Sequence, residues 1–494
     1  MWACPTSWWC PRNSGRRWCS VFVSRKPSWR GGAASTITGF VPASSSPPQI
    51  FQSVTIFPPD GSNPARPHSS NPKPSALTGV PANAMPKSST VVVGLEVGTS
   101  KVCAVVGEIN DSEELNIIGI GQCRSRGVRK GEVVDSSRAE EDIRTAIAEA
   151  EQMADVEIRS VYLGVTGSHI DSILNRGVHP VVSVDREITR EDVDDAIKNA
   201  RAVRLPSDNE IIHATRHHFM IDGQDGVVDP VGRFGSRVEV DMHVIHGNFN
   251  RLQNPIRTVK SLQIDVDAVA FTGLGSALSV LTADQRKMGT IVIDMGGGVT
   301  NYVAYAGGAV RHAGVLAVGG DHVTNDLAYG LKTPLKRAEQ LKIDYGSALV
   351  SDSARGQSIT TAAELGMPAR TINLEHLQHI ASLRLEEMLQ LVAQDLERHD
   401  ALSSLGGGVV LCGGVARTPR LLELAERVFH VPASLGRANS ISGIKSALDQ
   451  PEFATAIGLV RFASFHEKRK NVSTTFGQSL KHTLNGFLRR AMIL

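Results

Sequence analysis

The chain has 494 residues, of which 41% are hydrophobic and 21% are charged, and these values are ordinary for a soluble protein with more than one folding unit. The net charge of +2 hides an asymmetry, because residues 1–84 carry eight Lys and Arg against one acidic residue, Asp60. The remaining 44 basic and 49 acidic residues make the body mildly acidic, which argues against a general nucleic-acid binder.

Residues 1–84 differ from the rest of the chain. They hold all five tryptophans, thirteen of the 23 prolines, three of the six cysteines and no glutamate. Because no apolar periodicity continues beyond a few residues, we interpret 1–84 as a disordered or mis-annotated N-terminal extension, with Met85 as the true start. A targeting arm is the alternative. The cysteines show no paired metal spacing, which favours a reduced, cytosolic protein.

Buried strands and one helix are predicted after this segment. Apolar runs indicate strands over residues 91–95, 102–107, 115–121 and 160–165. Between the last two, Ser136 or Ser137 is expected to cap a helix. Its apolar face would carry Ile143, Ala146, Ile147, Ala150 and Met153.

Residues 169–250 interrupt that pattern and predict a small inserted α/β module. Thr189 opens a helix with Val193, Ala196, Ile197 and Ala200 on one face. Residues 211–215 and 238–245 are expected to form strands. The spacing of the five histidines in this region matches no standard metal-ligand set: His213, His217, His218, His243 and His246.

The second half of the chain alternates strands, glycines and helices. A strand over 310–318 precedes a helix that runs from Gly319 through Tyr329, and Thr333-Pro334 starts another helix. A long amphipathic helix is predicted over 374–398. A later strand enters the glycine pair Gly413-Gly414, after which Thr418 as N-cap and Pro419 at the first helical position are expected to start a helix over 420–429. The helix that starts at Thr333-Pro334 would bury Ala338, Leu341 and Ile343.

Two glycine turns stand out because they match. Glu96-Val97-Gly98 and Asp294-Met295-Gly296 each place an acid, an apolar residue and a glycine at the end of an apolar strand, and a hydroxyl follows each of them. Bare backbone N–H groups in such turns suit a polyphosphate, and the carboxylate of Asp294 suits hydrated Mg²⁺. A glycine-rich hairpin with a capping aspartate remains the simpler alternative for either turn alone. The pair indicates two similar lobes that share one nucleotide.

Together these elements resemble the actin-like ATPase superfamily, and within it the FtsA family of bacterial cell-division proteins. The resemblance runs from about Ser89 to the last residue. It rests on the segments 94–101, 161–167, 292–298, 333–334 and 410–414, on the insertion and on the C-terminal tail. The resemblance implies an α/β, two-lobed actin-like ATPase fold of duplicated ribonuclease-H-like lobes, with an inserted small α/β subdomain in the first lobe.

The resemblance also assigns roles to residues. Asp294 and Glu96 would be catalytic, and Asp294 would hold Mg²⁺. Glu339 and Lys342 would face ribose and adenine. The other residues implied in binding ATP are Gly98, Thr99, Ser100, Lys101, Gly296, Gly297, Gly298, Thr300, Gly320, Gly413 and Gly414.

Two departures from the superfamily pattern bear on turnover. Actin-like ATPases generally have aspartate where Glu96 stands, and often aspartate where Asn301 stands. Both changes are compatible with binding, but they argue against rapid hydrolysis. We therefore expect at most a slow Mg-dependent ATPase, in which ATP acts mainly as an assembly switch.

The C-terminal tail predicts a membrane contact. Residues 466–475 are expected to be a linker, and residues 476–494 an amphipathic helix that lies in an anionic interface. A helix that docks back on the body is the alternative. The sequence contains no run of about 18 apolar residues, the length that would predict a helix spanning a bilayer. The expected membrane-binding residues are Phe476, Leu480, Leu484, Phe487, Leu488, Arg489 and Arg490.

The family resemblance implies partners and a domain plan. Partners would be FtsZ, further copies of the chain, later division proteins that bind the module, and the cytoplasmic face of the inner membrane at the division site, with no nucleic acid. The first lobe would comprise 85–168 and 251–285, the module 169–250, and the second lobe 286–465, with 320–395 as its upper subdomain. A PilM-like pilus-assembly ATPase or a small-molecule kinase of the same superfamily is the alternative.

Overall fold

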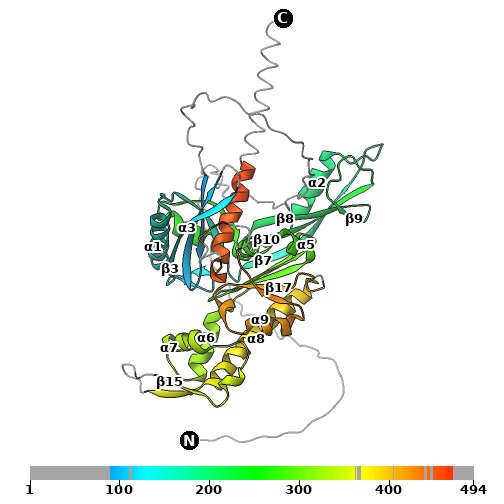
Figure 1. Cartoon of the computed structure of the whole chain (residues 1–494). Coiled ribbons are helices and arrows are strands. Elements are labelled where there is room, and N and C mark those ends of the chain that lie inside the picture. Colours follow the sequence, from blue (N-terminus) through cyan, green and yellow to red (C-terminus); the bar gives the residue numbers. More distant parts are fainter. Residues whose placement is uncertain are drawn as a thin grey trace, which may run out of the picture. The chain divides into compact units, whose positions relative to one another are not determined.

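The computed structural model describes residues 90–470 apart from 111–113, 362, 364–368, 404, 439–441 and 445–448 (Figure 1). The predicted extension over 1–84, residues 471–475 of the predicted linker and the predicted amphipathic helix over 476–494 lie outside the described residues. In the described part, no helix is both long and apolar enough to cross a membrane.

The first lobe is built on a sheet in the order β11-β6-β1-β2-β3-β19. Alternate residues of β1 and β2 face opposite sides, so Val93 and Leu95 pack with helices α1 and α3, while Val92 and Val105 pack with the final helix over 454–470. Both faces are therefore buried, as the continuous valine runs predict. The bounds are β1 Thr90–Val97, β2 Lys101–Ile109, β3 Leu115–Arg124, β6 Ser160–Val165, β11 Asp265–Phe271, β19 Ser442–Gly443, α1 Ser136–Ala154 and α3 Phe249–Lys260.

The final helix lies unusually close to the first lobe. A Cβ on Gly458 would come within 1.7 Å of the Gly275 carbonyl oxygen in α4 (Thr272–Val280), and one on Gly94 in β1 would come within 2.7 Å of the Ala456 oxygen. The sequence prediction was wrong here in two ways. Residues 454–465 pack on the first lobe rather than the second, and residues 466–470, assigned to the linker, continue the helix.

The inserted module consists of a four-stranded sheet in the order β7-β10-β8-β9 with helix α2 against it (Figure 1). A capping box at Thr189 starts α2, as predicted, and its buried residues are Val193, Ala196 and Ala200. The bounds are β7 Ile170–Pro180, β8 Asn209–Ile221, β9 Gln224–Val227, β10 Arg237–Asn248 and α2 Arg190–Arg201.

The second lobe has a sheet in the order β14-β13-β12-β17-β18. Helices α6, α7, α8 and α9 share one hydrophobic core with this sheet. The bounds are β12 Thr290–Met295, β13 Thr300–Ala306, β14 Ala309–Leu316, β17 Val409–Cys412, β18 Ala433–Leu435, α5 Ala283–Met288, α6 Gly320–Gly330, α7 Leu335–Tyr345, α8 Leu374–Arg398 and α9 Leu421–Phe429. Shorter elements are β4 Val128–Arg129, β5 Glu132–Val133, β15 Ser358–Thr361, β16 Arg370–Asn373 and the 3₁₀ turns Asp352–Ala354, Gly414–Arg417 and Pro451–Phe453.

The two lobes repeat one topology. In each, an antiparallel pair (β1 with β2, β12 with β13) continues into a third strand, and the first strand pairs in parallel with a later one, β6 or β17. Glu96 pairs with Cys103 across the first hairpin, and Asp294 pairs with Asn301 across the second. The duplicated lobes and the inserted subdomain predicted from the sequence are confirmed.

The module borders the second lobe along β14. Ser172 Oγ of β7 donates to the Ala313 carbonyl at 2.6 Å, and His217 Nε2 of β8 donates to the Val310 carbonyl at 2.7 Å. Polar groups that join two elements in this way replace hydrogen bonds that a strand edge would otherwise make with water.

Several local predictions are corrected. Asp135, not Ser136 or Ser137, caps α1 by accepting from the Arg138 amide. Thr418 and Pro419 do not open α9, because a 3₁₀ turn precedes them and Arg420 in a left-handed conformation is the N-cap. Met153 and Ile343, expected inside, are 52% and 65% exposed.

A buried histidine makes stability depend on pH. His213 Nε2 accepts from the Phe271 amide at 2.9 Å, and burial lowers its pKa to about 3. The unfolded chain binds a proton at this residue below pH ~6.5 while the folded chain does not, so folding weakens as pH falls from ~6.5 toward the folded pKa, by about 1.4 kcal/mol per pH unit.

We predict that His213→Gln, whose amide oxygen can accept the same bond, reduces this loss. Urea unfolding from pH 6.5 to 4.5 should show a shallower fall in the free energy of unfolding than in the unmodified chain. The control His218→Gln changes an exposed residue on the same strand and should leave the slope unchanged. Equal slopes in all three proteins would contradict the prediction.

Candidate functional site

The two matched turns have the same construction. In the first, between β1 and β2, the Gly98 amide donates to the Lys101 carbonyl at 3.0 Å. In the second, between β12 and β13, the Gly296 amide donates to the Val299 carbonyl at 2.9 Å. Each lobe thus ends its equivalent strand in a four-residue turn, as the sequence repeat predicts.

The turns lie against each other. A Cβ on Gly298 would be 2.5 Å from Thr99 Oγ1, and one on Gly297 would be 3.0 Å from Ser100 Cβ. Side chains at these glycines would therefore force the turns apart. Thr99 Oγ1 also accepts from the Gly131 amide at 2.9 Å, which fixes the first turn to the β4–β5 hairpin.

The middle of each turn presents backbone N–H groups. Within the part of the chain that the structure describes, the amides of Thr99, Ser100, Gly297 and Gly298 donate no hydrogen bond. They are the second and third residues of the two equivalent turns. Two pairs of N–H groups that meet at one place form a concavity suited to an anion.

Asp294 is a buried carboxylate at the junction of several elements. Its Oδ2 accepts from Ser276 Oγ of α4 and from Thr455 Oγ1 of the final helix, both at 2.8 Å. Burial raises the pKa of Asp294, and these hydrogen bonds and the Lys101 charge oppose the rise. The sequence prediction did not identify Ser276 or Thr455, which lie 18 and 161 residues from Asp294.

The hydrogen bonding continues to the first lobe. Thr166, which follows β6, donates to Asn301 Oδ1 at 2.5 Å, and a hydrogen bond from Asn301 in turn lowers the pKa of Asp294. Asn301, which departs from the superfamily pattern, thus links the two lobes through uncharged polar groups.

Glu96 is held by a lysine. Lys101 Nζ lies 3.5 Å from Glu96 Oε2 and 4.7 Å from the centre of the Phe453 ring. Burial raises the pKa of Glu96, and the Lys101 charge opposes this; Asp294 adds to the rise, so the two carboxylates interact. Among the described residues, neither Lys101 Nζ nor Glu96 Oε2 has a hydrogen-bond partner. Lys101 is the last residue of the turn that contains the Thr99 and Ser100 amides, and a buried ammonium without hydrogen bonds suits phosphate oxygens.

Helix α6 begins beside the second turn, and the amides of its first two residues are already hydrogen-bonded within the protein. The Gly320 amide donates to the Gly296 carbonyl at 2.9 Å and the Asp321 amide to the Gly297 carbonyl at 2.8 Å. Gly320 therefore supports the turn instead of offering its N–H group to a ligand. Asp321, whose pKa burial raises, also lies near Gly297 and was not predicted.

Two predicted residues of α7 meet this helix start. Lys342 Nζ donates to the Gly320 carbonyl at 3.2 Å, to Thr324 Oγ1 at 2.9 Å and to Glu339 Oε2 at 2.7 Å. Thr324 Oγ1 also donates to Glu339 Oε2. The structure thus brings Glu339 and Lys342 to the start of α6, which borders the second turn.

The third glycine element, Gly413-Gly414, follows β17 and lies next to Asp294. Gly413 has φ of 83°, and a Cβ there would lie 2.5 Å from Asp294 Oδ1. Gly414 has open space around it. Thr300, predicted to contact nucleotide, is fully buried and donates to the Val318 carbonyl at 2.9 Å, so its hydroxyl is already used. Cys412 is buried.

Comparisons with known proteins agree with this architecture. A family model described as cell division protein FtsA matches residues 291–458, and one described as the SHS2 domain inserted in FtsA matches residues 167–246. The cell division protein FtsA of Pseudomonas aeruginosa is 36% identical over 376 residues, 76% of this chain and 90% of that protein. That of Escherichia coli is 35% identical over 413 residues, 81% and 98% respectively.

A solved structure, titled the PilM-PilN type IV pilus biogenesis complex, has a TM-score of 0.53 at 16% identity, and the match covers 76% of this chain and 98% of that one. Two lobes with one strand order and matched glycine turns define an actin-like ATPase fold. The chain belongs to the FtsA family of cell division proteins.

We predict that Thr455→Val destabilises the protein by about 1.5–3 kcal/mol, because it removes a hydrogen bond to a buried carboxylate. Urea unfolding measures the loss. The matched control is Thr145→Val, whose exposed hydroxyl donates only within its own helix to the Glu141 carbonyl. If the two variants lose the same stability, Thr455 does not support Asp294.

Proposed function

We propose that this FtsA-family protein binds Mg·ATP at the paired turns and polymerises at the cytoplasmic face of the inner membrane. There it anchors FtsZ filaments at the division site and recruits later division proteins through the inserted module. The observation that carries the nucleotide part is the contact between two turns whose four middle amides have no internal hydrogen bonds, one of them ending in the buried ammonium of Lys101.

The residues present fit a metal-bound nucleotide. The amides of Thr99, Ser100, Gly297 and Gly298 and the Lys101 ammonium would hold phosphates, and the Asp294 carboxylate would hold hydrated Mg²⁺. Glu339 and Lys342 would meet the adenosine, with Gly413 and Gly414 on its other side. Gly320 and Thr300 are left with supporting roles, because the Gly320 amide and the Thr300 hydroxyl are already bonded inside the protein.

The residues around the site favour a switch over rapid turnover. When bound, Mg·ATP supplies a terminal phosphate whose presence or loss distinguishes two states. Glu96 faces the Lys101 ammonium at 3.5 Å, so its carboxylate is held by a charge. Asn301 neither accepts nor releases a proton near pH 7 and stays bonded to Thr166. Proton abstraction from water is therefore poorly supported, and hydrolysis is slow.

We predict that Lys101→Met weakens ATP binding about 10–100-fold, because a charged hydrogen bond is worth about 1.5–3 kcal/mol. Titration with a fluorescent ATP analogue measures the change in Kd. The control Lys336→Met removes an exposed charge from α7 and should bind normally. Unchanged ATP binding by Lys101→Met would contradict the proposal that Lys101 holds the phosphates. Phosphate release by the unmodified chain at ~1–1,000 per second would contradict the slow step.

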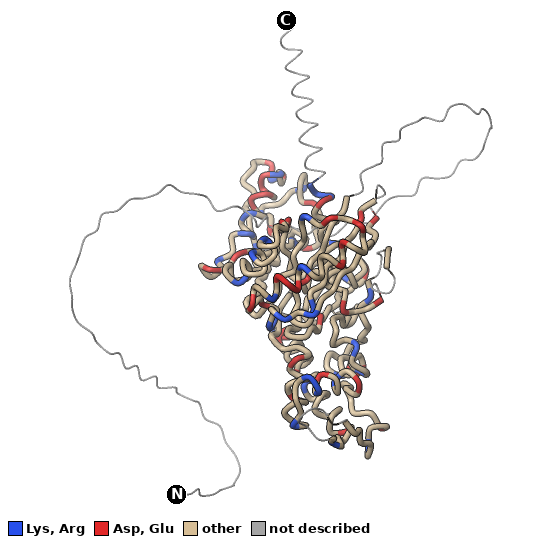
Figure 2. Tube along the Cα trace, turned by 90° about the vertical axis from the view of Figure 1, so that its left-hand side faces the viewer, with Lys and Arg blue, Asp and Glu red and all other residues tan. Residues whose placement is uncertain are grey.

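The family comparison separates the alternatives for the whole protein. Similarity to the PilM-PilN complex at 16% identity reflects the fold, whereas about 35% identity over nearly the whole length of FtsA proteins places this chain in cell division. Figure 2 shows Lys and Arg interspersed with Asp and Glu along the described trace. Such mixing favours protein partners over nucleic acid, which selects for clustered positive charge.

The membrane part of the proposal rests on the sequence of residues 476–494. One face would carry Phe476, Leu480, Leu484, Phe487 and Leu488, and Arg489 and Arg490 would add attraction to anionic lipids.

We predict that the full chain sediments with acidic liposomes and, with ATP, brings FtsZ with it. Phe487→Glu should release it, whereas Asn485→Glu adds the same charge on the opposite face and should largely retain binding. Equal binding by both variants would contradict the amphipathic arrangement. Membrane binding without FtsZ recruitment would contradict the anchoring role and reopen the kinase alternative.

A further inference from the structure

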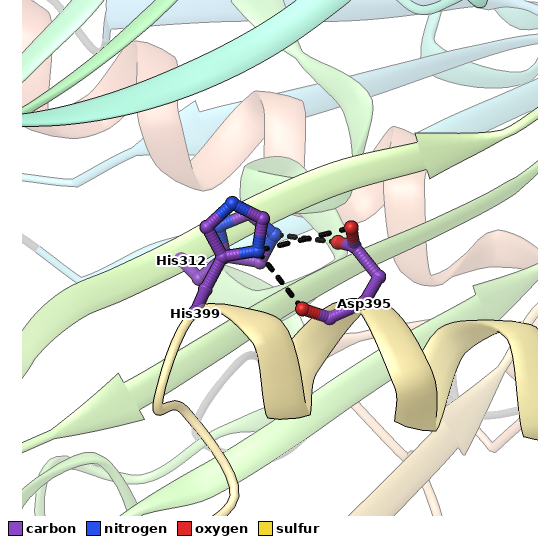
Figure 3. A group of neighbouring side chains, drawn as sticks. All are labelled: His312, Asp395 and His399. Carbon is purple, nitrogen blue, oxygen red and sulfur yellow. Dashed lines mark hydrogen bonds and ion pairs between the residues drawn. The ribbon is translucent and has the colours of Figure 1, made fainter. Parts of the chain in front are cut away.

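A second polar cluster lies in the second lobe, outside the paired turns. His312 comes from β14, Asp395 from the last turn of α8, and His399 is the residue that follows this helix as its C-cap (Figure 3). One ligand atom from each residue lies within 4.8 Å of the others, and this is the only such group of His, Cys, Asp or Glu among the described residues. None of the functional assignments above uses it.

The end of α8 supplies two of these side chains. Asp395 lies in the last turn of the helix, and His399 is the C-cap residue that follows it. His399 Nδ1 hydrogen-bonds the Asp395 backbone carbonyl at 2.8 Å and lies 3.8 Å from Asp395 Oδ1, so the imidazole and the carboxylate are next to each other.

The strand supplies the third side chain in register with them. His312 Nε2 lies 2.7 Å from Asp395 Oδ2, and the rings of His312 and His399 are stacked with centroids 4.0 Å apart. Figure 3 shows both rings beside the Asp395 carboxylate, with His399 Nδ1 also joined to the Asp395 backbone oxygen. Two ligands bound tetrahedrally at ~2.0–2.1 Å are about 3.3 Å apart, and the separations of 2.7 Å and 3.8 Å lie on either side of that value.

The surroundings of the carboxylate suit a metal site. Tyr302 Oη of β13 donates to Asp395 Oδ2 at 2.6 Å, the oxygen that His312 also contacts, and this bond orients the carboxylate. His312 is buried, whereas the His399 side chain is 48% exposed, so one side of the cluster is open to solvent. A metal can enter there and keep water as a further ligand.

We propose that His312, Asp395 and His399 bind a divalent transition metal of the zinc class, with one ion per chain. Two imidazoles and a carboxylate match the preference of Zn²⁺ for nitrogen and oxygen ligands, and they suit Ca²⁺ and Mg²⁺ poorly because those ions select oxygen. The proposal is independent of nucleotide binding.

Such an ion would act on the seam between the second lobe and the inserted module. His312 is adjacent to Ala313, whose carbonyl and amide both bond Ser172 Oγ of β7. Linking His312 to the end of α8 would fix β14 between the module on one side and a long helix on the other. The ion would therefore be structural, holding the module in place.

The test measures Zn²⁺ binding by the metal-free full chain. Isothermal titration calorimetry gives the affinity and the number of ions, and the visible spectrum of Co²⁺, used as a zinc substitute, reports the coordination geometry. We expect one ion per chain with a tetrahedral Co²⁺ spectrum, and a melting temperature that rises with Zn²⁺ and falls back with EDTA. His399→Ala removes a half-exposed ligand and should abolish this binding while keeping the fold, as judged by circular dichroism.

The control is His379→Ala, an exposed histidine on the same helix outside the cluster, which should bind like the unmodified chain. Tyr302→Phe should weaken Zn²⁺ binding about 10–100-fold, because it removes only the hydrogen bond that orients Asp395. Equal binding by the unmodified chain and His399→Ala, or no binding by either, would overturn the proposal and leave the cluster as a hydrogen-bonded link. Neither result would bear on ATP binding.

Discussion

The Asp294 carboxylate, buried and held by two hydroxyls, is the interaction on which the arrangement of this protein depends. Ser276 comes from a helix of the first lobe, Thr455 from a helix packed on the first lobe, and Asp294 from the central strand of the second. An ionisable group is costly to bury without hydrogen bonds, so these contacts are what allow it to stand there. The position of one lobe relative to the other is thereby tied to the state of one side chain.

Duplication explains why this carboxylate has a counterpart. Glu96 and Asp294 stand at the same place in equivalent hairpins, yet their environments differ: Glu96 has an ammonium beside it, and Asp294 has hydroxyls. Carboxylates in different environments take different roles. The ion pair leaves the first lobe with a neutralised acid, whereas the second lobe keeps an acid whose hydrogen bonds come from uncharged groups.

Local patterns in the sequence were sufficient for much of the fold and the turns. Valine runs, acid–apolar–glycine steps and the Thr189 cap are short-range signals, and each corresponds to an observed element. The contacts of Asp294 were not accessible in this way, since Thr455 lies 161 residues away and a hydroxyl in an apolar helix has no distinctive pattern. Helical periodicity also placed Met153 and Ile343 inside, although more than half of each side chain is exposed. The predicted N-cap of α9 was wrong because Arg420, the actual N-cap, adopts a left-handed conformation that arginine does not favour.

The close contact of the final helix with the first lobe has a mechanical consequence. Gly458 and Gly94 let this helix approach α4 and β1 at backbone distance, so it cannot slide without breaking dense packing. Within the described residues this helix runs from 454 to 470, and Thr455 in its first turn donates to the Asp294 carboxylate. A pull along the axis of the helix would therefore reach Thr455 as a rigid-body shift and pass from there to the Asp294 side chain. The junction of the two lobes is in this way mechanically coupled to a helix whose Thr455 lies 161 residues further along the chain.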